Sequence, residues 1–121
     1  MADEEFIVAG YIRKRGSFYS LVLGQYRKDV LVYKGHVTSG VTKDAVEMLD
    51  KTGKNPFHIL PVGNEDAVWV ETNHVCVVEY MPSTLHSLRQ PVFKGFRDDV
   101  IPEEVQIRAE GVEVRPPLPE I

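Results

Sequence analysis

The sequence predicts a mainly β domain, a five-stranded Greek-key barrel with one helix between the third and fourth strands. Three observations lead to this prediction. Segments of β-branched and aromatic residues recur between turn signals, a single helix signal follows the third segment, and the pattern occupies only about 100 residues, enough for one core. A small antiparallel sandwich is the main alternative, although it would not require a helix to close one end.

The start of the chain reads as three antiparallel strands. Residues 6–13 are apolar and rich in β-branched and aromatic side chains, and Gly10 in their middle indicates a bulge or a sharp bend. Residues 18–26 form a second apolar segment that carries Gly24. Residues 30–37 alternate between two faces with the period of a strand. The short connections between these segments predict a meander.

One helix of about three turns is predicted after the third strand. Thr42 is a suitable N-cap, and Val41 and Val46 stand at the two positions of a hydrophobic staple. Gly53 is a suitable left-handed terminator. Residues 54–66 contain prolines and Gly-Asn without sustained periodicity, which predicts a loop.

Two further strands complete the predicted barrel. A strand is expected at residues 74–80, with a possible start at 67–71, and the last strand covers residues 88–97. Simple alternation places the side chains of the last strand on two faces, with Val92, Lys94 and Phe96 on one and Phe93, Gly95 and Arg97 on the other. Glu103 and Glu104, after a proline, predict one helical turn.

The elements divide the chain into three parts. Residues 1–5 are acidic and are predicted to be a hinge or linker, residues 6–105 are the barrel domain, and residues 106–121 are predicted to be an extended, mobile tail because they end in a proline-rich segment. The formal net charge of -4 comes mostly from the last 24 residues, which hold seven acidic and two basic side chains. The body of the domain is therefore nearly neutral.

Composition excludes several classes of protein. The single cysteine, Cys76, stands among valines and is expected to be a buried, unreactive thiol. The four histidines show no ligand spacing, so no metal site is predicted. No segment approaches the roughly 20 apolar residues of a membrane helix, and the acidic start is unlike a secretory signal. We expect a cytoplasmic, monomeric protein without a membrane partner.

Basic side chains are the candidates for contact with nucleic acid. They are Arg13, Lys14, Arg15, Arg27, Lys28, Lys34, Arg89 and Lys94. Several are expected to be solvated surface charges only, and Lys34 is favoured because it lies within a strand. Arg97 has a comparable alternative, since it could simply pair with Asp98 or Asp99 on the surface.

An ordered set of segments resembles the C-terminal OB domain of ATP-dependent DNA ligases, especially the bacterial type found in end-joining repair. The segments are residues 6–11, 21–26, 33–40, 55–57, 68–70, 78–80 and, as the closest block, 88–97. The resemblance implies that the predicted barrel is an OB-fold. It extends over nearly the whole chain up to Val105.

In this family the domain ends in a nucleotidyltransferase motif with an arginine, a spaced acid and a lysine. Arg97 matches the arginine and Asp99 the acid, and residues 102–105 match the Pro-Glu-Glu-Val that follows. Val100 stands where the family usually has lysine. The part of that lysine is therefore absent here or is taken by Lys94.

The resemblance implies a domain that closes over a nucleotidyltransferase domain, orients the phosphates of ATP during lysine adenylation, and then contacts nicked duplex DNA. It implies ATP and Mg2+ in the complete enzyme, with neither bound by this domain alone. Residues 51–54 read Lys-Thr-Gly-Lys and lack the acid of the family's Lys-x-Asp-Gly nucleophile motif. We expect an excised ligase domain, or one acting in trans, that is inactive alone. A free-standing OB module that binds single-stranded nucleic acid or a protein is the alternative.

Overall fold

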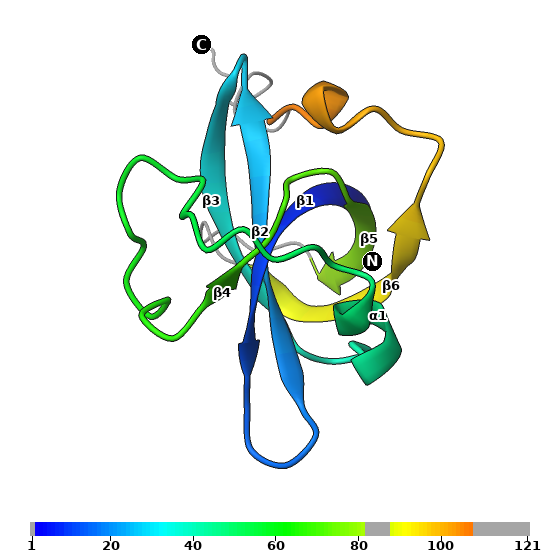
Figure 1. Cartoon of the computed structure of the whole chain (residues 1–121). Helices are drawn as coiled ribbons and strands as arrows, with labels where there is room; N and C mark the ends of the chain where they lie inside the picture. The colour runs from blue at the N-terminus through cyan, green and yellow to red at the C-terminus, as the bar shows by residue number, and fades with distance from the viewer. Residues whose placement is uncertain (1, 82–87, 108–121) are drawn as a thin grey trace, which may run out of the picture.

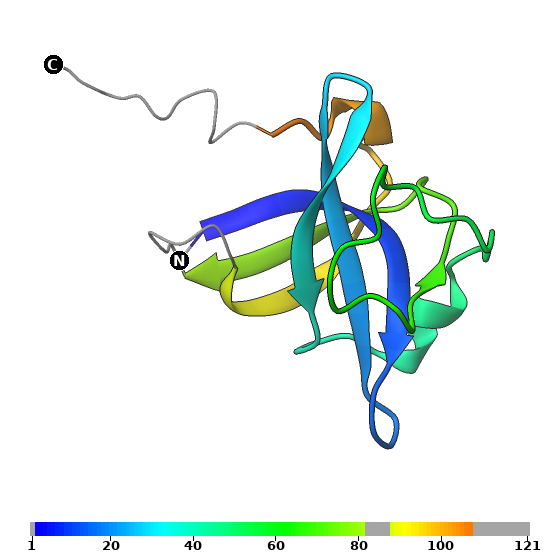
Figure 2. The same ribbon diagram turned by 90° about the vertical axis from the view of Figure 1, so that its left-hand side faces the viewer.

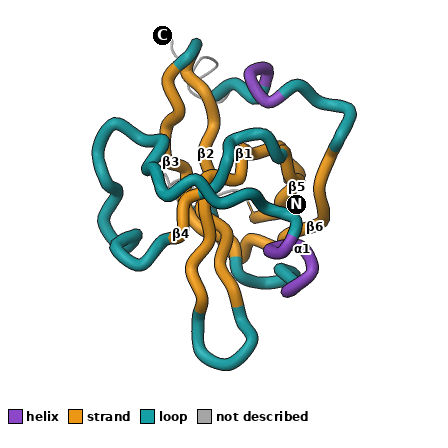
Figure 3. Tube along the Cα trace, viewed as in Figure 1, coloured by secondary structure: helices purple, strands orange, loops and turns teal. Residues whose placement is uncertain are grey.

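The computed structural model describes residues 2–81 and 88–107. In chain order its elements are β1 (Ala2–Arg13), β2 (Tyr19–Arg27), β3 (Val30–Val37), α1 (Lys43–Glu47), β4 (Val68–Trp69), β5 (Val75–Met81), β6 (Arg89–Arg97) and the 3-10 helix η1 (Pro102–Glu104) (Figures 1 and 3). The predicted order of strands and helix is confirmed. The third strand has the predicted limits, and β4 lies within residues 67–71, the predicted possible start of the fourth strand, but is a separate short strand.

The strands form one antiparallel sheet in the order β3-β2-β1-β5-β6, and β4 pairs with β1. The two ends of this sheet meet: Ser39, just after β3, bridges Val92 of β6, and the Phe93 N–H donates to the Ser39 carbonyl at 2.8 Å. Gly40 has a φ of +87°, and a Cβ there would lie 2.5 Å from the Phe93 carbonyl oxygen. Glycine is therefore needed where the barrel closes. Figure 2 shows how strongly β1 bends along its length, between the part that pairs with β5 and the part that pairs with β2. The fold is the predicted OB-fold.

The first strand begins at Ala2 rather than at residue 6, so residues 2–5, predicted as a linker, instead form the start of β1. They pair with β5 from Glu5 opposite Val77 to Ala2 opposite Tyr80. The Glu4 carboxylate accepts hydrogen bonds from Gln25 and Tyr80. Acidic side chains that find such partners can belong to a strand, which composition alone does not reveal. A hinge role for these residues stays a prediction.

The helix is shorter than the predicted three turns, because α1 has five residues. Its start is as predicted: the Thr42 hydroxyl accepts from the Ala45 N–H at 3.1 Å. Its end is early because the following backbone pairs elsewhere. The Glu71 N–H donates to the Asp50 carbonyl, and the Thr52 N–H donates to Trp69. This second set of hydrogen bonds satisfies groups that a longer helix would have used.

The core consists of two apolar clusters that cover both faces of β1. Phe6 and Val8 belong to the first cluster, together with Val46 of α1 and Leu49 just after it, so the helix closes one end of the barrel as predicted. Ile7 and Ala9 belong to the second cluster, which includes Phe57, Trp69 and Val105 from segments outside the long strands. A strand buried on both faces loses the simple polar-apolar alternation.

The end of the domain lies beside the turn between β2 and β3. Gln106 bridges Tyr26, the Ile107 N–H donates to the Tyr26 carbonyl at 2.8 Å, and the Gln106 side chain accepts from the Lys28 N–H. Residues 106 and 107 are therefore attached to the barrel rather than part of the predicted tail. Residues 108–121 lie outside the described part of the chain. No helix among the described residues is long and apolar enough to cross a membrane.

Candidate functional site

A register shift in β6 determines where its cations lie. Gly95 pairs with Val77 and Phe93 pairs with the next residue along β5, which leaves Lys94 as the additional residue. Phe93 and Phe96 consequently both pack against the first core cluster, with ring centroids 5.3 Å apart. Lys94 and Arg97 are both exposed. The predicted alternation, which placed Lys94 and Phe96 on one face and Phe93 and Arg97 on the other, is therefore wrong in this strand.

Arg97 lies at the end of β6 between two carboxylates. Its Nε and Nη2 donate to the two oxygens of Asp99 at 3.0 and 2.8 Å, and its Nη1 donates to Glu5 Oε2 at 2.8 Å. The hydrogen bonds with Asp99 raise the pKa of Arg97 and lower the pKa of Asp99. The surface ion pair with Asp99 expected as the alternative is thus present, but it includes a third group. Three of the five guanidinium N–H donors are used, which leaves two for a ligand.

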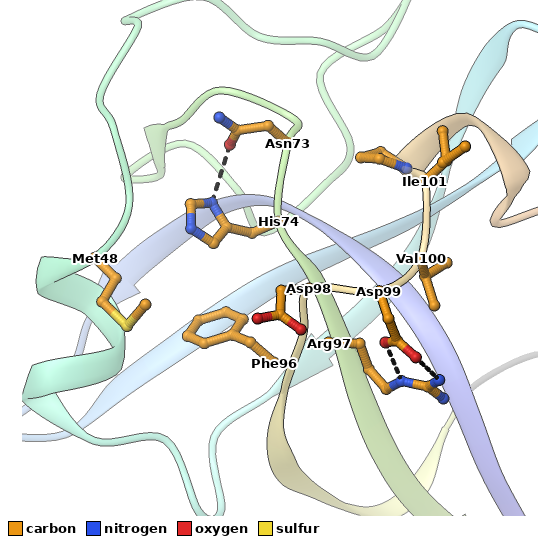
Figure 4. Close-up of a pocket in the computed structure, with 10 residues that line it drawn as sticks. Met48, Asn73, His74, Phe96, Arg97, Asp98, Asp99, Val100 and Ile101 are labelled. Atoms are coloured by element: carbon orange, nitrogen blue, oxygen red, sulfur yellow. Dashed lines mark hydrogen bonds and ion pairs between the residues drawn. The ribbon is translucent and has the colours of Figure 1, made fainter.

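A depression of about 610 Å3 lies beside Arg97 (Figure 4). Residues of β6 and the segment after it form most of its lining. Met48 at the end of α1 and Asn73 and His74 in the turn before β5 complete it. The His74 ring lies 5.3 Å from the Phe96 ring, and its Nδ1 lies 2.9 Å from Asn73 Oδ1. The depression therefore combines one guanidinium, carboxylates and an apolar floor.

Val100, where the resemblance leads us to expect a lysine, is half-buried and packs against the second core cluster. That cluster includes Val105, which is buried and also belongs to the segment after β6. A valine here contributes apolar contact that holds the segment to the barrel. Lys94 lies in β6 and is exposed. Of Val100 and Lys94, only Lys94 can therefore offer a second cation besides Arg97.

The candidate cations for DNA do not form one patch. Arg13, Lys14 and Arg15 lie at the turn between β1 and β2, whereas Arg27 and Lys28 lie at the turn between β2 and β3. At about 3.3 Å per residue, the nine residues of β2 hold these turns roughly 25 Å apart. They lie at opposite ends of the molecule in Figure 1.

Two more candidates lie away from both turns. Lys34 is half-buried in β3, at a register shift opposite Leu23 and Gly24. Arg89 is exposed at the start of β6, at the other end of that strand from Arg97. Of the predicted site residues, the structure brings together only Arg97 and Asp99 by direct contact, with Lys94 nearby on the same strand.

Sequence reasoning missed two side chains of the site. Glu5 was assigned to a linker, yet it binds Arg97 across 92 residues of sequence. His74 was treated only as a residue without metal-ligand spacing, yet it packs on Phe96 beside the depression. Strand pairing brings both residues to β6, since Ile7 pairs with Val75 and Val75 with Arg97. No local pattern around Glu5 or His74 indicates these contacts.

The described residues contain no group of three His, Cys, Asp or Glu side chains placed to share a metal ion. Cys76 is buried within the first cluster, and burial raises the pKa of its thiol to about 12. A thiol with so high a pKa is a poor nucleophile. Arg97 and its surroundings are therefore the main candidate site.

The model of the family described as "ATP dependent DNA ligase C terminal region" matches residues 14–100. The chain belongs to this family. The matched region of this ligase domain contains Arg97, Asp99 and Val100, together with most of the candidate DNA cations.

Two solved structures are similar to this ligase domain. The ligase domain of LigD from M. tuberculosis has a TM-score of 0.76 and 28% identity, and a mycobacterial DNA ligase D complexed with ATP and MES has a TM-score of 0.73 and 28% identity. Both matches cover 89% of this chain but only 39% and 38% of the other chains. The chain thus spans about two fifths of these relatives. Comparison with curated proteins finds no significant match.

Proposed function

We propose that this chain closes over the nucleotidyltransferase domain of an ATP-dependent DNA ligase, orients the phosphates of ATP while a lysine of that domain is adenylated, and then contacts nicked duplex DNA. In this proposal it acts as a monomeric domain in the cytoplasm. Mg2+ would arrive with ATP and take its ligands from ATP and the catalytic domain. The sequence contains no Lys-x-Asp-Gly segment, so we infer that the chain supplies the closing half of the site and not the nucleophile.

The observation that carries the proposal is the placement of Arg97. Its guanidinium lies at the exposed end of a paired strand, on the edge of a depression, and the two hydrogen bonds to Asp99 fix its orientation. A cation fixed in this way loses little conformational entropy when it meets a ligand. Its remaining donors suit a phosphate, because a guanidinium is planar and always charged.

The chemistry requires such a group on the leaving side of ATP. The lysine amine attacks the α-phosphorus, so an N–P bond forms and the bond from the α-phosphorus to the oxygen that bridges to the β-phosphate breaks. Pyrophosphate leaves, and the lysine proton passes to a base or to water. Negative charge builds up on the leaving oxygen, and Arg97, with Lys94 on the same strand, would stabilise it there. Asp99 holds Arg97 and is a positioning residue in this scheme.

The DNA contact of the proposal begins at the turn between β1 and β2. Arg13, Lys14 and Arg15 are exposed there, and they form no ion pair with a described residue. Free cations at a protruding hairpin can release counterions from a phosphate backbone without first breaking a contact. Lys34, Arg27, Lys28 and Arg89 remain predicted contacts at other places on the barrel.

Adenylation in trans tests the proposal. The nucleotidyltransferase domain of the ligase is incubated with ATP, with and without this chain, and the lysine-AMP adduct is measured. We expect the chain to accelerate adduct formation, the Arg97→Ala chain to lose most of that effect, and the Lys54→Ala chain, which lacks an exposed loop cation, to retain it. Equal acceleration by the Arg97→Ala chain would refute the assigned role.

One observation favours the alternative of a free-standing module for single-stranded nucleic acid. Phe18 is 64% exposed at the turn that carries the three cations, and an exposed aromatic ring beside basic side chains can stack on an unpaired base. Tight, salt-sensitive binding of the chain to unpaired strands, without preference for nicked duplex, would support this alternative against the ligase proposal.

A further inference from the structure

We propose that the depression beside Arg97 is the surface on which the nucleotidyltransferase domain docks, and that Met48 and Ile101 are its apolar anchor residues. This inference rests on the proposed function. It adds a contact that would hold the closed arrangement together, distinct from the contact of Arg97 with phosphate.

Met48 and Ile101 line the depression from different segments. Met48 is the residue that ends α1, and Ile101 directly precedes η1. Each is 57% exposed, although each is large and apolar. In Figure 4 Met48 lies beside Phe96, whereas Ile101 lies on the opposite side of the depression, next to Val100. The surface therefore combines exposed apolar side chains with an arginine at its edge, and such residues are common anchors of protein interfaces.

Because Met48 and Ile101 line the same depression as Arg97, all three should contact the same partner. If the Arg97 guanidinium enters the ATP site of the catalytic domain, the surface around that site must come to lie over the depression. Met48 and Ile101 are then covered, and the removal of their apolar area from water favours the closed arrangement. Methionine suits such a contact because its unbranched, flexible side chain adapts to a partner surface.

Charge indicates a protein and not nucleic acid as the occupant. Asp98 and Asp99 line the depression, and Glu5 lies against Arg97, so three carboxylates surround one guanidinium. A DNA backbone brought here would meet net negative charge, whereas ATP would arrive with Mg2+, which offsets its own charge. About three fifths of each of the two similar ligase structures is protein that this chain does not match, and the proposed partner domain would belong to that part.

Two anchors are also consistent with a contact that must open again. The same domain has to release the catalytic domain before it contacts DNA, and interfaces that form and separate repeatedly are small. A weak apolar contact of this kind should influence the adenylation step, which needs the closed arrangement, and not the sealing of a nick that is already adenylated.

The test uses this chain together with its nucleotidyltransferase domain, as one polypeptide or in trans. The Met48→Ser/Ile101→Ser variant is compared with the unchanged chain, with Met48→Leu/Ile101→Val as the conservative rescue. Ile59→Ser/Val62→Ser is the matched control, because those side chains are 80% and 92% exposed in the loop before β4 and do not line the depression. Far-ultraviolet circular dichroism on heating verifies folding.

We expect the serine variant to adenylate at least about tenfold more slowly, as when interface anchors are removed, and the rescue and control variants to keep the original rate. Sealing of a pre-adenylated nick should change less than twofold. An unchanged adenylation rate would overturn the inference. So would an equal slowing of both steps, or sedimentation showing a dimer of this chain that the serine variant separates.

The outcome is distinguishable from failure of the proposed function. If Arg97→Ala slows adenylation and the serine variant does not, only the docking inference is wrong. If Arg97→Ala has no effect, the proposed function itself is wrong.

Discussion

Arg97 and Glu5 are joined by a hydrogen bond of 2.8 Å from Nη1 to Oε2, which links the end of β6 to the first part of β1. Glu5 is also the last of the residues that the sequence assigned to a linker. The contact occupies the edge of the guanidinium that Asp99 leaves free. A phosphate that approaches Arg97 from that edge has to compete with the Glu5 carboxylate.

Replacing Glu5 by glutamine should therefore lower the KM for ATP in the adenylation step. The neutral amide oxygen competes less strongly than a carboxylate for the Nη1 donor, while Asp99 still orients the guanidinium. The free energy of unfolding should change by less than about 1 kcal/mol, because both side chains are partly exposed. Steady-state adenylation kinetics and urea unfolding measure the two quantities.

Asp3→Asn is the control for this prediction. It removes the same charge two residues earlier on β1, at an exposed position. If Asp3→Asn lowers KM as much as Glu5→Gln, general electrostatics and not the specific contact is responsible. A raised KM in Glu5→Gln would mean that Glu5 helps to position Arg97 instead of competing for it.

Val100→Lys should destabilise the domain by about 1 kcal/mol, since a half-buried side chain that packs against the second cluster is replaced by one that must keep its ammonium in water. Val62→Lys, at a position that is 92% exposed, should change stability by less than about 0.5 kcal/mol. Chemical unfolding of both variants measures the difference. Equal stability of the two would contradict a packing role for Val100.

Gly40→Ala should destabilise the barrel more than an alanine substitution at any other glycine with a positive φ. Left-handed backbone costs a non-glycine residue about 1–2 kcal/mol, and the clash with the Phe93 carbonyl adds about 1–3 kcal/mol. Gly53→Ala is the control, with a φ of +73° and open space at its Cβ, so only the backbone cost applies. A thermal scan in which both variants melt together would argue against barrel closure at Gly40.

The turn between β1 and β2 should dominate the contact with duplex DNA. Lys14→Gln/Arg15→Gln should weaken binding to a nicked duplex and reduce the slope of log K against log salt by about 1 for each phosphate that the protein no longer neutralises. The comparison is Arg27→Gln/Lys28→Asn, with asparagine chosen because Lys28 has a φ of 60°. Fluorescence anisotropy across a salt series measures both. Equal weakening in the two variants would contradict the prediction, since it would mean that the duplex contacts the turns at both ends of β2.

Local patterns predicted the parts of the fold that depend on neighbouring residues. The alternation of residues 30–37 gave the limits of β3, and the Thr42 side chain caps α1 as expected. The end of α1 was not predictable in this way, because it is determined by hydrogen bonds from residues 50–52 to the segment around β4. Helix propensity and capping signals depend on residues within the helix and do not report hydrogen bonds that other segments offer to its end.

The sequence predicted site residues that are close together in the chain, but not those that distant segments bring to the site. The motif match identified Arg97 and Asp99, which lie two residues apart and bind each other. The place of Lys94 was wrong because the additional residue in β6 reverses the alternation, and such a shift depends on the facing strand. Glu5 required the pairing of β1 with β5 and of β5 with β6, which no local pattern contains.

The most direct test of the central claim is the single-turnover rate of lysine adenylation in the ligase that carries this chain. We predict that Arg97→Ala slows this rate by about 100-fold, as removal of a charge-stabilising donor does, and that Arg97→Lys restores part of it. Lys54→Ala should leave it unchanged. A rate for Arg97→Ala within twofold of the unchanged enzyme would contradict the delivery of Arg97 to the phosphates of ATP.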